Sequence, residues 1–170
     1  MFDVVVGVRY EHFTTKVTNL RNNQDFKVTD DLWSPRAGLI FKPVENASIY
    51  ASYSRTYLPR GGDQLTALNA SNESLAPEKY QNYEIGAKWD VIDQRLSLTA
   101  ALFQTDKTNA RVSDGLGGTI NAGSQRVRGA ELGWAGSLTN HWRVFGGYSY
   151  LDAITTDGGS APSIYKKANR

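Results

Sequence analysis

The sequence contains no cysteine, which excludes disulfide frameworks, thiolate metal sites and cysteine nucleophiles together. No apolar run approaches the roughly 18 residues that a membrane-spanning helix needs, so an α-helical membrane protein is also excluded. A net charge of +2 gives no strong electrostatic field, and nucleic acid is not expected as a partner. The 170 residues correspond to about one domain, and the 4 Trp, 9 Tyr and 6 Phe argue against disorder.

Catalytic motifs are also absent. The sequence has no G-x-S-x-G elbow, no H-E-x-x-H and no P-loop, and its two histidines, His12 and His141, fall in segments that we expect to place them far apart. The glycine-rich run 115–118 is interpreted as a turn rather than as a phosphate cradle. We therefore expect neither an enzyme, nor a resident cofactor, nor a metal site.

A period of two, typical of β-strands, runs through almost the whole sequence. In residues 2–10 the even positions are Phe, Val, Val, Val and Tyr, while the odd positions include Asp3 and Arg9. The same alternation predicts strands over 31–42, 47–57, 80–89, 96–103, 130–135 and 142–150, which the sequence joins as hairpins. About seven strands, many of ten or more residues, are longer than those of a typical soluble sandwich.

Short and long connections alternate along the chain. Tight turns are predicted at 43–46, 90–94 and 138–141, and loops near 18–30, 58–77, 113–119 and 155–163. Long strands, one apolar face and loops at every second junction are typical of a transmembrane antiparallel β-barrel. In such a barrel the tight turns would lie on the periplasmic side and the loops outside.

The alternation assigns two faces to the predicted sheet. The lipid-facing set is Val4, Val6, Val8, Leu39, Ile85, Leu96, Leu98 and Leu132, and the lumen-facing set is Arg36, Glu84, Lys88 and Glu131. Arg126 and Arg128 share the parity of Leu132, so a regular strand would point them toward lipid. Either they lie beyond the hydrocarbon, or Gly129 marks a bulge that reverses the faces; we favour the bulge.

The run 57–64, Tyr-Leu-Pro-Arg-Gly-Gly-Asp-Gln, stands where a strand leaves the expected membrane. An aromatic ring, a cation and flexible backbone suit an anionic, aryl-bearing ligand. Tyr57 would stack on such a ligand and Arg60 would neutralise it, with Gln64 and Arg111 as further hydrogen-bonding groups at the same rim. The alternative is an ordinary loop stem whose Arg60 faces solvent or lipid phosphate.

Four blocks resemble a known family in its own order. Residues 75–88 (LAPEKYQNYEIGAK) resemble the L-x-P-E-x-x-x-x-Y-E-[IL]-G-x-K strand of TonB-dependent outer-membrane receptors, and 96–109 resemble the strand that follows it. Residues 121–132 resemble the G-x-x-R-x-x-G-x-E strand, and 142–153 fit the next one. Residues 50–59 with 61–64 are most similar to receptors of the ferric catecholate-siderophore type.

This resemblance implies an all-β, transmembrane antiparallel β-barrel of about 22 strands in the bacterial outer membrane, of which about seven are present. Residues 1–170 would be a partial barrel domain without the plug domain, through which such receptors contact TonB. The implied function is TonB-dependent uptake of a ferric siderophore. The siderophore supplies the iron ligands, so no cofactor is needed, and outer-membrane lipid or lipopolysaccharide (LPS) is the other expected partner.

Two other functions stay open from the sequence. The first alternative is a passive porin-like or structural outer-membrane barrel. The second is an outer-membrane enzyme, which would need a Ser/His or Asp/His constellation at one barrel rim. Binding of a ferric siderophore by the intact protein would separate the receptor from the first alternative, and mutation of the two histidines would test the second.

Overall fold

A computed structural model describes residues 1–59, 68, 73–113 and 119–157. They form one antiparallel sheet in which every strand pairs with its sequence neighbour, in the order β1 to β7. The strands are β1 (Phe2–Asn19), β2 (Gln24–Val44), β3 (Ala47–Leu58), β4 (Glu78–Val91), β5 (Leu96–Ser113), β6 (Thr119–Ser137) and β7 (Arg143–Asp157). The predicted all-β class and the seven antiparallel strands are therefore confirmed. Among the described residues, no helix is long and apolar enough to span a membrane.

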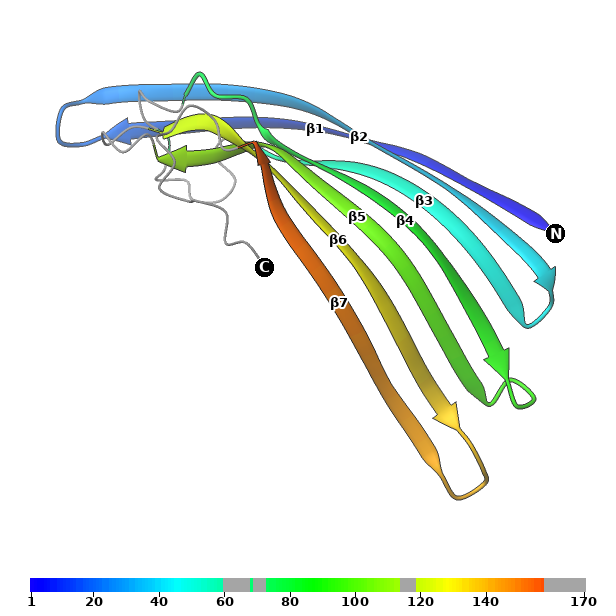
Figure 1. Ribbon diagram of the computed structural model, residues 1–170. Coiled ribbons are helices and arrows are strands. Elements are labelled where there is room, and N and C mark those ends of the chain that lie inside the picture. The colour runs from blue at the N-terminus through cyan, green and yellow to red at the C-terminus, as the bar shows by residue number, and fades with distance from the viewer. Residues whose placement is uncertain (60–67, 69–72, 114–118, 158–170) are drawn as a thin grey trace.

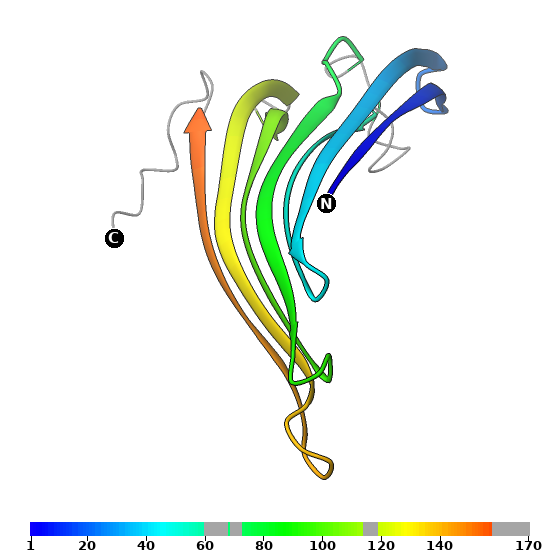
Figure 2. The same ribbon diagram turned by 90° about the vertical axis from the view of Figure 1, so that its right-hand side faces the viewer.

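The sheet is a single curved layer, with β1 and β7 at its two free edges (Figure 1). Figure 2 shows the curvature from the side, with the three short turns together at the lower end. These turns join β2 to β3, β4 to β5 and β6 to β7, as the sequence predicts. In the β4–β5 turn, Ile92, Asp93 and Gln94 all have positive φ, between 52° and 64°, so the chain reverses in a tight left-handed bend. The curved sheet is an open segment and does not close into a barrel.

The β1–β2 hairpin is longer than the sequence suggested. The predicted loop at 18–30 is wrong, because paired strands continue to Asn19 and resume at Gln24. The reason is an apolar contact with a residue far along the chain: Phe26 and Val28 are buried against Leu68, with Val17 packed beside them. Leu68 lies in the β3–β4 connection, so this small cluster fixes that connection to the hairpin.

The two predicted faces are confirmed by the register. Val4 pairs with Leu39, and Ile85 pairs with Leu102, so the aliphatic side chains form continuous cross-strand rows. We call this the outer face. The opposite, inner face carries the polar set Arg36, Tyr50, Glu84, Lys88 and Glu131, and the hydroxyl of Tyr50 donates a hydrogen bond to Glu84.

The inner face is the more crowded of the two, as expected on the concave side of a curved sheet. A Cβ on Gly86 would meet the Tyr50 ring at 2.5 Å, and one on Gly129 would meet the Phe103 ring at 2.5 Å. On the outer face, by contrast, Ile85 and Leu102 are 53 % and 60 % exposed. The aliphatic rows therefore have no protein partner in this segment, which suits a surface that meets lipid.

Aromatic side chains mark two levels on the outer face. Near the loop end, the rings of Tyr10 and Trp33 lie 4.8 Å apart and those of Tyr53 and Tyr83 lie 5.1 Å apart. Near the short turns, Trp89 and Trp134 both pair with Leu98 on β5. These levels match the two girdles of a membrane barrel, and the strand segments between them are the expected membrane-spanning parts.

The predicted bulge at Gly129 is wrong. Pairing between β5 and β6 is unbroken from Leu96 opposite Gly136 to Lys107 opposite Gln125, so Arg126 and Arg128 remain on the outer face. The irregularity lies instead on β5 near Asn109, which has a φ of 59°. Gln104 pairs with Tyr83 on one side and with Arg128 on the other, so Arg128 lies at the level of the aromatic side chains. Arg126 lies two residues nearer the loop end. Both arginines are therefore at or beyond the aromatic level rather than among the aliphatic side chains.

Candidate ligand-binding site

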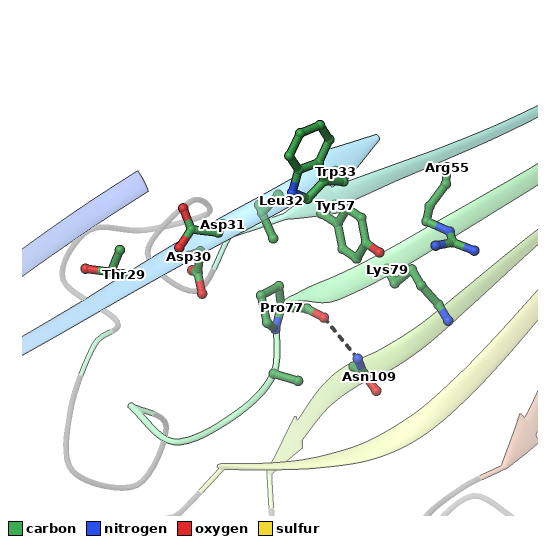
Figure 3. Close-up of a pocket in the computed structure, with 11 residues that line it drawn as sticks. Thr29, Asp30, Asp31, Leu32, Trp33, Arg55, Tyr57, Pro77, Lys79 and Asn109 are labelled. Carbon is green, nitrogen blue, oxygen red and sulfur yellow. Dashed lines mark hydrogen bonds between the residues drawn. The ribbon is translucent and has the colours of Figure 1, made fainter. Parts of the chain in front are cut away.

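The loop end of the sheet contains a cavity where β2 and β3 separate. These strands pair only as far as Arg36 opposite Ser54, after which β2 continues with β1 and β3 with β4. The resulting space has a volume of about 460 Å³, and Figure 3 shows its lining. It is lined by Thr29, Asp30, Asp31, Leu32, Trp33, Arg55, Tyr57, Ala76, Pro77, Lys79 and Asn109.

Cationic and aromatic groups meet in this cavity. Arg55 and Lys79 extend from the β3–β4 side, and Tyr57 lies beside them (Figure 3). On the β2 side, Asp31 accepts hydrogen bonds from the hydroxyl of Tyr10 at 2.7 Å and lies 2.7 Å from Nδ1 of His12. By register, Trp33, Arg55, Tyr57 and Lys79 belong to the outer face, whereas Asp30 and Leu32 belong to the inner face.

Asn109 ties the end of the β3–β4 connection to β5. Its side-chain amide donates a hydrogen bond of 3.1 Å to the carbonyl oxygen of Pro77 (Figure 3). Asn tolerates the left-handed backbone that this position adopts better than most residues do. The rim of the cavity is thus held from both sides, by Asn109 on one and by the Leu68 contact on the other.

A second group of polar side chains lies on the inner face at the same end of the sheet. The ammonium of Lys107 contacts Glu78 Oε2 at 2.9 Å and lies 5.5 Å from the centre of the Tyr80 ring. Glu78 is buried, and its Oε1 accepts a 3.0 Å hydrogen bond from the backbone N–H of Arg111. We call Glu78, Tyr80, Lys107 and Arg111 the inner rim cluster. Lys107 is paired with Glu78 beside the Tyr80 phenol, and Arg111 joins the cluster through its backbone N–H.

Glu78 lies five residues beyond Tyr83, outside the expected membrane-spanning part of β4. Burial raises the pKa of its carboxyl, but the Arg111 N–H and the Lys107 ammonium outweigh burial and lower the pKa below its usual range. A depressed carboxyl pKa stabilises the fold above the unfolded value of about 4.3 and loses that contribution as the pH falls through the folded pKa.

We therefore expect the intact protein to lose stability on acidification partly through Glu78. Its free energy of unfolding should fall between about pH 5 and pH 3, and the Glu78→Gln variant should show a shallower fall over that range. Equilibrium unfolding in urea at a series of pH values measures both slopes. Parallel slopes for the two proteins would contradict this role of Glu78.

The four predicted ligand residues are only partly placed by the structure. Tyr57 is half-buried, lines the cavity and pairs with Lys79. Arg111 belongs to the inner rim cluster through Glu78, while Arg60 and Gln64 lie outside the described residues. The register puts Tyr57 on the outer face, and the strand pair β3–β4 separates it from Arg111.

Sequence reasoning missed Arg55, Lys79, Tyr80 and Lys107 as candidate site residues. The face that each of them occupies could have been predicted from the sequence, because Tyr80 alternates with Lys79 just as Glu84 alternates with Ile85. The separation of β2 from β3 was not, since both strands alternate regularly through the point where pairing stops. In the described part of the chain, no group of three or more His, Asp or Glu side chains could hold a metal ion.

Comparison with known protein families gives one consistent match. The family model described as TonB dependent receptor-like, beta-barrel, matches residues 1–167. A probable TonB-dependent siderophore receptor, PiuA of Acinetobacter baumannii, is 38 % identical over 165 residues, which cover 92 % of this chain and 22 % of that protein. The catecholate siderophore receptor Fiu of Escherichia coli K12 is 34 % identical over 140 residues, covering 79 % of this chain and 18 % of Fiu.

Solved structures agree with the sequence matches. The crystal structure of PiuA from Acinetobacter baumannii superposes with a TM-score of 0.83 at 37 % identity, covering 95 % of this chain and 25 % of that chain. The ferric-catecholate import receptor Fiu from E. coli K12 superposes with a TM-score of 0.75 at 29 % identity, covering 94 % and 27 % respectively. The chain thus spans about a fifth to a quarter of the length of these relatives.

Proposed function

Because this chain belongs to the TonB-dependent receptor family, as part of its β-barrel domain, we propose that the intact protein imports a ferric siderophore across the bacterial outer membrane. Members of this family are receptors and transporters rather than enzymes, and their barrels lie in the outer membrane. Relatives that are 34 % and 38 % identical to it over the aligned residues are named as siderophore receptors, which favours this function over a passive porin-like barrel.

The observation that carries the proposal is the polar chemistry at the loop end of the sheet. The inner rim cluster provides Lys107 over the Tyr80 ring, and the backbone N–H of Arg111 donates a hydrogen bond to Glu78 in the same cluster. A ferric tris-catecholate is an anion with aryl surfaces, which such groups bind by charge and by ring contacts. Within this proposal, Tyr57, Arg60, Gln64 and Arg111 are the ligand contacts, and the siderophore itself holds the iron.

Two further partners belong to the same proposal. Energy for import would come from TonB through a plug domain, whereas residues 1–167 match the barrel of the family. The aliphatic rows of the outer face would contact the acyl chains of outer-membrane lipid, and LPS would surround the loop end. Apolar and polar side chains alternate along the seven long strands, and this alternation supports the lipid contact.

Substitution of Arg60 tests the ligand contacts. In the full-length receptor, Arg60→Ala should weaken binding of a ferric tris-catecholate by about 10- to 100-fold, since a charge-assisted hydrogen bond contributes roughly 1.5–3 kcal/mol. Arg60→Lys should recover only part of the affinity, because lysine keeps the charge but lacks the planar fork. Equilibrium binding of the radioactive iron complex measures both variants.

Arg21→Ala is the matched control, because Arg21 is an exposed cation in the β1–β2 turn and, within the residues that the structure describes, only its backbone N–H makes a hydrogen bond, to Asn19. Its affinity should equal that of the wild type. Unchanged affinity in both Arg60 variants would instead identify Arg60 as a loop-stem residue that faces solvent or lipid phosphate. Tyr57→Ala and Arg111→Ala, measured in the same way, would then show which face of the sheet the ligand contacts.

A further inference from the structure

We propose that Asn109 is a positioning residue for the ferric siderophore, because it ends the pairing of β4 with β5 and thereby fixes the backbone at Arg111. This inference rests on the proposed function, in which Arg111 is one of the ligand contacts. It draws on the register of the strands at the loop end, on the backbone conformation of Asn109 and on two hydrogen bonds that replace the regular ladder there.

The ladder between β4 and β5 stops near the loop end of the sheet. Its last pair is Lys79 opposite Thr108, and β4 begins one residue earlier, directly after Pro77. Because proline has no backbone N–H, a regular ladder cannot continue through Pro77. On its other side, β5 stays paired with β6 as far as Ser113. Beyond Thr108, therefore, β5 is no longer joined to β4 by the regular ladder.

Two side chains replace the ladder at this point, one from each strand. The amide of Asn109 donates a hydrogen bond of 3.1 Å to the carbonyl oxygen of Pro77 (Figure 3), and the carboxylate of Glu78 accepts one of 3.0 Å from the backbone N–H of Arg111. A backbone group at the end of each strand is thus satisfied by a side chain of the other, as capping side chains do at helix ends. We call Asn109 and Glu78 the strand cap.

The backbone of β5 is displaced where the strand cap forms. Relative to β6, β5 carries one extra residue between Lys107 and Ala110, and β6 carries one extra residue before Arg111, so the register is restored there. Asn109 lies within this bulge with a φ of 59°, a left-handed conformation that asparagine adopts more readily than most residues. Ala110 is only 2 % exposed, so the bulge is a packed part of the sheet.

The backbone at Arg111 is thereby held from two directions. Glu78 accepts its N–H, and the bulge at Asn109 determines the direction in which the chain reaches it. A ligand contact that is already in place before binding loses less conformational entropy when the ligand arrives, so its affinity is higher. The amide of Asn109 is itself occupied by Pro77. We therefore expect Asn109 to raise affinity through Arg111 rather than by touching the chelate.

The test measures the affinity of the purified full-length receptor for a radioiron tris-catecholate. Asn109→Gly keeps the left-handed backbone and removes the amide, so affinity should fall about 3- to 10-fold. Asn109→Ala also disfavours the backbone conformation, and it should weaken binding further, by about 10- to 30-fold. Full affinity in both variants would overturn the inference.

Combination with Arg111→Ala distinguishes positioning from a general effect on the fold. In the Arg111→Ala receptor, Asn109→Gly should change the affinity by less than about twofold, because the contact that it positions is already gone. A purely structural role of Asn109 predicts instead the same fall in both backgrounds. That result would overturn the inference.

Asn23 provides the matched control. It has a φ of 54°, lies exposed in the β1–β2 turn, and its side chain makes no hydrogen bond to the residues that the structure describes. Asn23→Gly and Asn23→Ala should both bind the chelate as the wild type does, although Asn23→Ala disfavours a similar backbone conformation. Losses equal to those of the Asn109 variants would show that affinity responds to backbone strain at any turn, and would contradict a positioning role.

The wild type separates this inference from the proposed function. Absence of saturable binding of the tris-catecholate to the wild-type receptor would contradict the proposed function, and the inference with it. Saturable binding by the wild type, together with full affinity in both Asn109 variants, would contradict the inference alone.

Discussion

Replacing Leu102 with arginine should destabilise the intact barrel by about 2–4 kcal/mol, the cost of a cation on the lipid face at the bilayer midplane. Leu102 is 60 % exposed on the outer face and pairs with Ile85 and Ala130, between the two aromatic levels. Leu98 has the same parity but is level with Trp89 and Trp134, so the cost of a charge there should fall to about 0–1 kcal/mol.

Two matched variants make this measurement specific. Leu102→Ala removes the same side chain without adding charge, and Thr99→Arg adds the same charge on the inner face of the same strand. Both should be much closer to the wild type in unfolding from lipid vesicles in urea. If Leu102→Arg were as stable as Leu102→Ala, the assignment of the outer face to lipid would be wrong.

The second large effect is expected at Glu78. Its substitution by alanine should destabilise the receptor by about 3 kcal/mol, because it leaves Lys107 partly buried without a counter-ion and removes the acceptor of the Arg111 N–H. Lys107→Met should cost less, since Glu78 keeps its hydrogen bond from Arg111. The free energy of unfolding of both variants and of the double variant gives the coupling between the two side chains.

Glu11→Ala provides the comparison with a surface pair. Glu11 accepts from Arg9 at 2.7 Å, but the arginine side chain is 64 % exposed, so this substitution should cost about 1 kcal/mol or less. Equal losses for Glu11→Ala and Glu78→Ala would show that the inner rim cluster is no more than a solvated ion pair.

Most of the sheet could be predicted because the alternation of apolar and polar side chains can be recognised within the sequence of each strand. The alternation of Val4, Val6 and Val8 with Asp3 and Gly7 determines which face each side chain occupies. The register then places the apolar side chains of neighbouring strands on the same face of the sheet. The short turns were predictable for a similar local reason. At Leu96, however, local parity is not enough: its side chain has the predicted outer parity but is buried beside the β5–β6 end, where Gly136 approaches its backbone.

The errors arose where a distant contact decides the structure. Phe26 and Val28 form strand rather than loop because Leu68, some forty residues away, covers them. Arg126 stays on the outer face without a bulge because Asp106 on the neighbouring strand neutralises it. The cavity depends on where β2 and β3 stop pairing, and no residue of either strand signals that point locally.

The central claim is that the intact receptor recognises an anionic, aryl-bearing ferric chelate, and the most direct test compares two chelates of similar size. Equilibrium binding of a radioiron tris-catecholate and of a neutral ferric trihydroxamate to the purified full-length receptor should show saturable binding of the catecholate, at least about tenfold tighter than the other complex. Saturable binding of neither would support a passive barrel, and a preference for the neutral complex would contradict recognition by the cations and rings at the loop end.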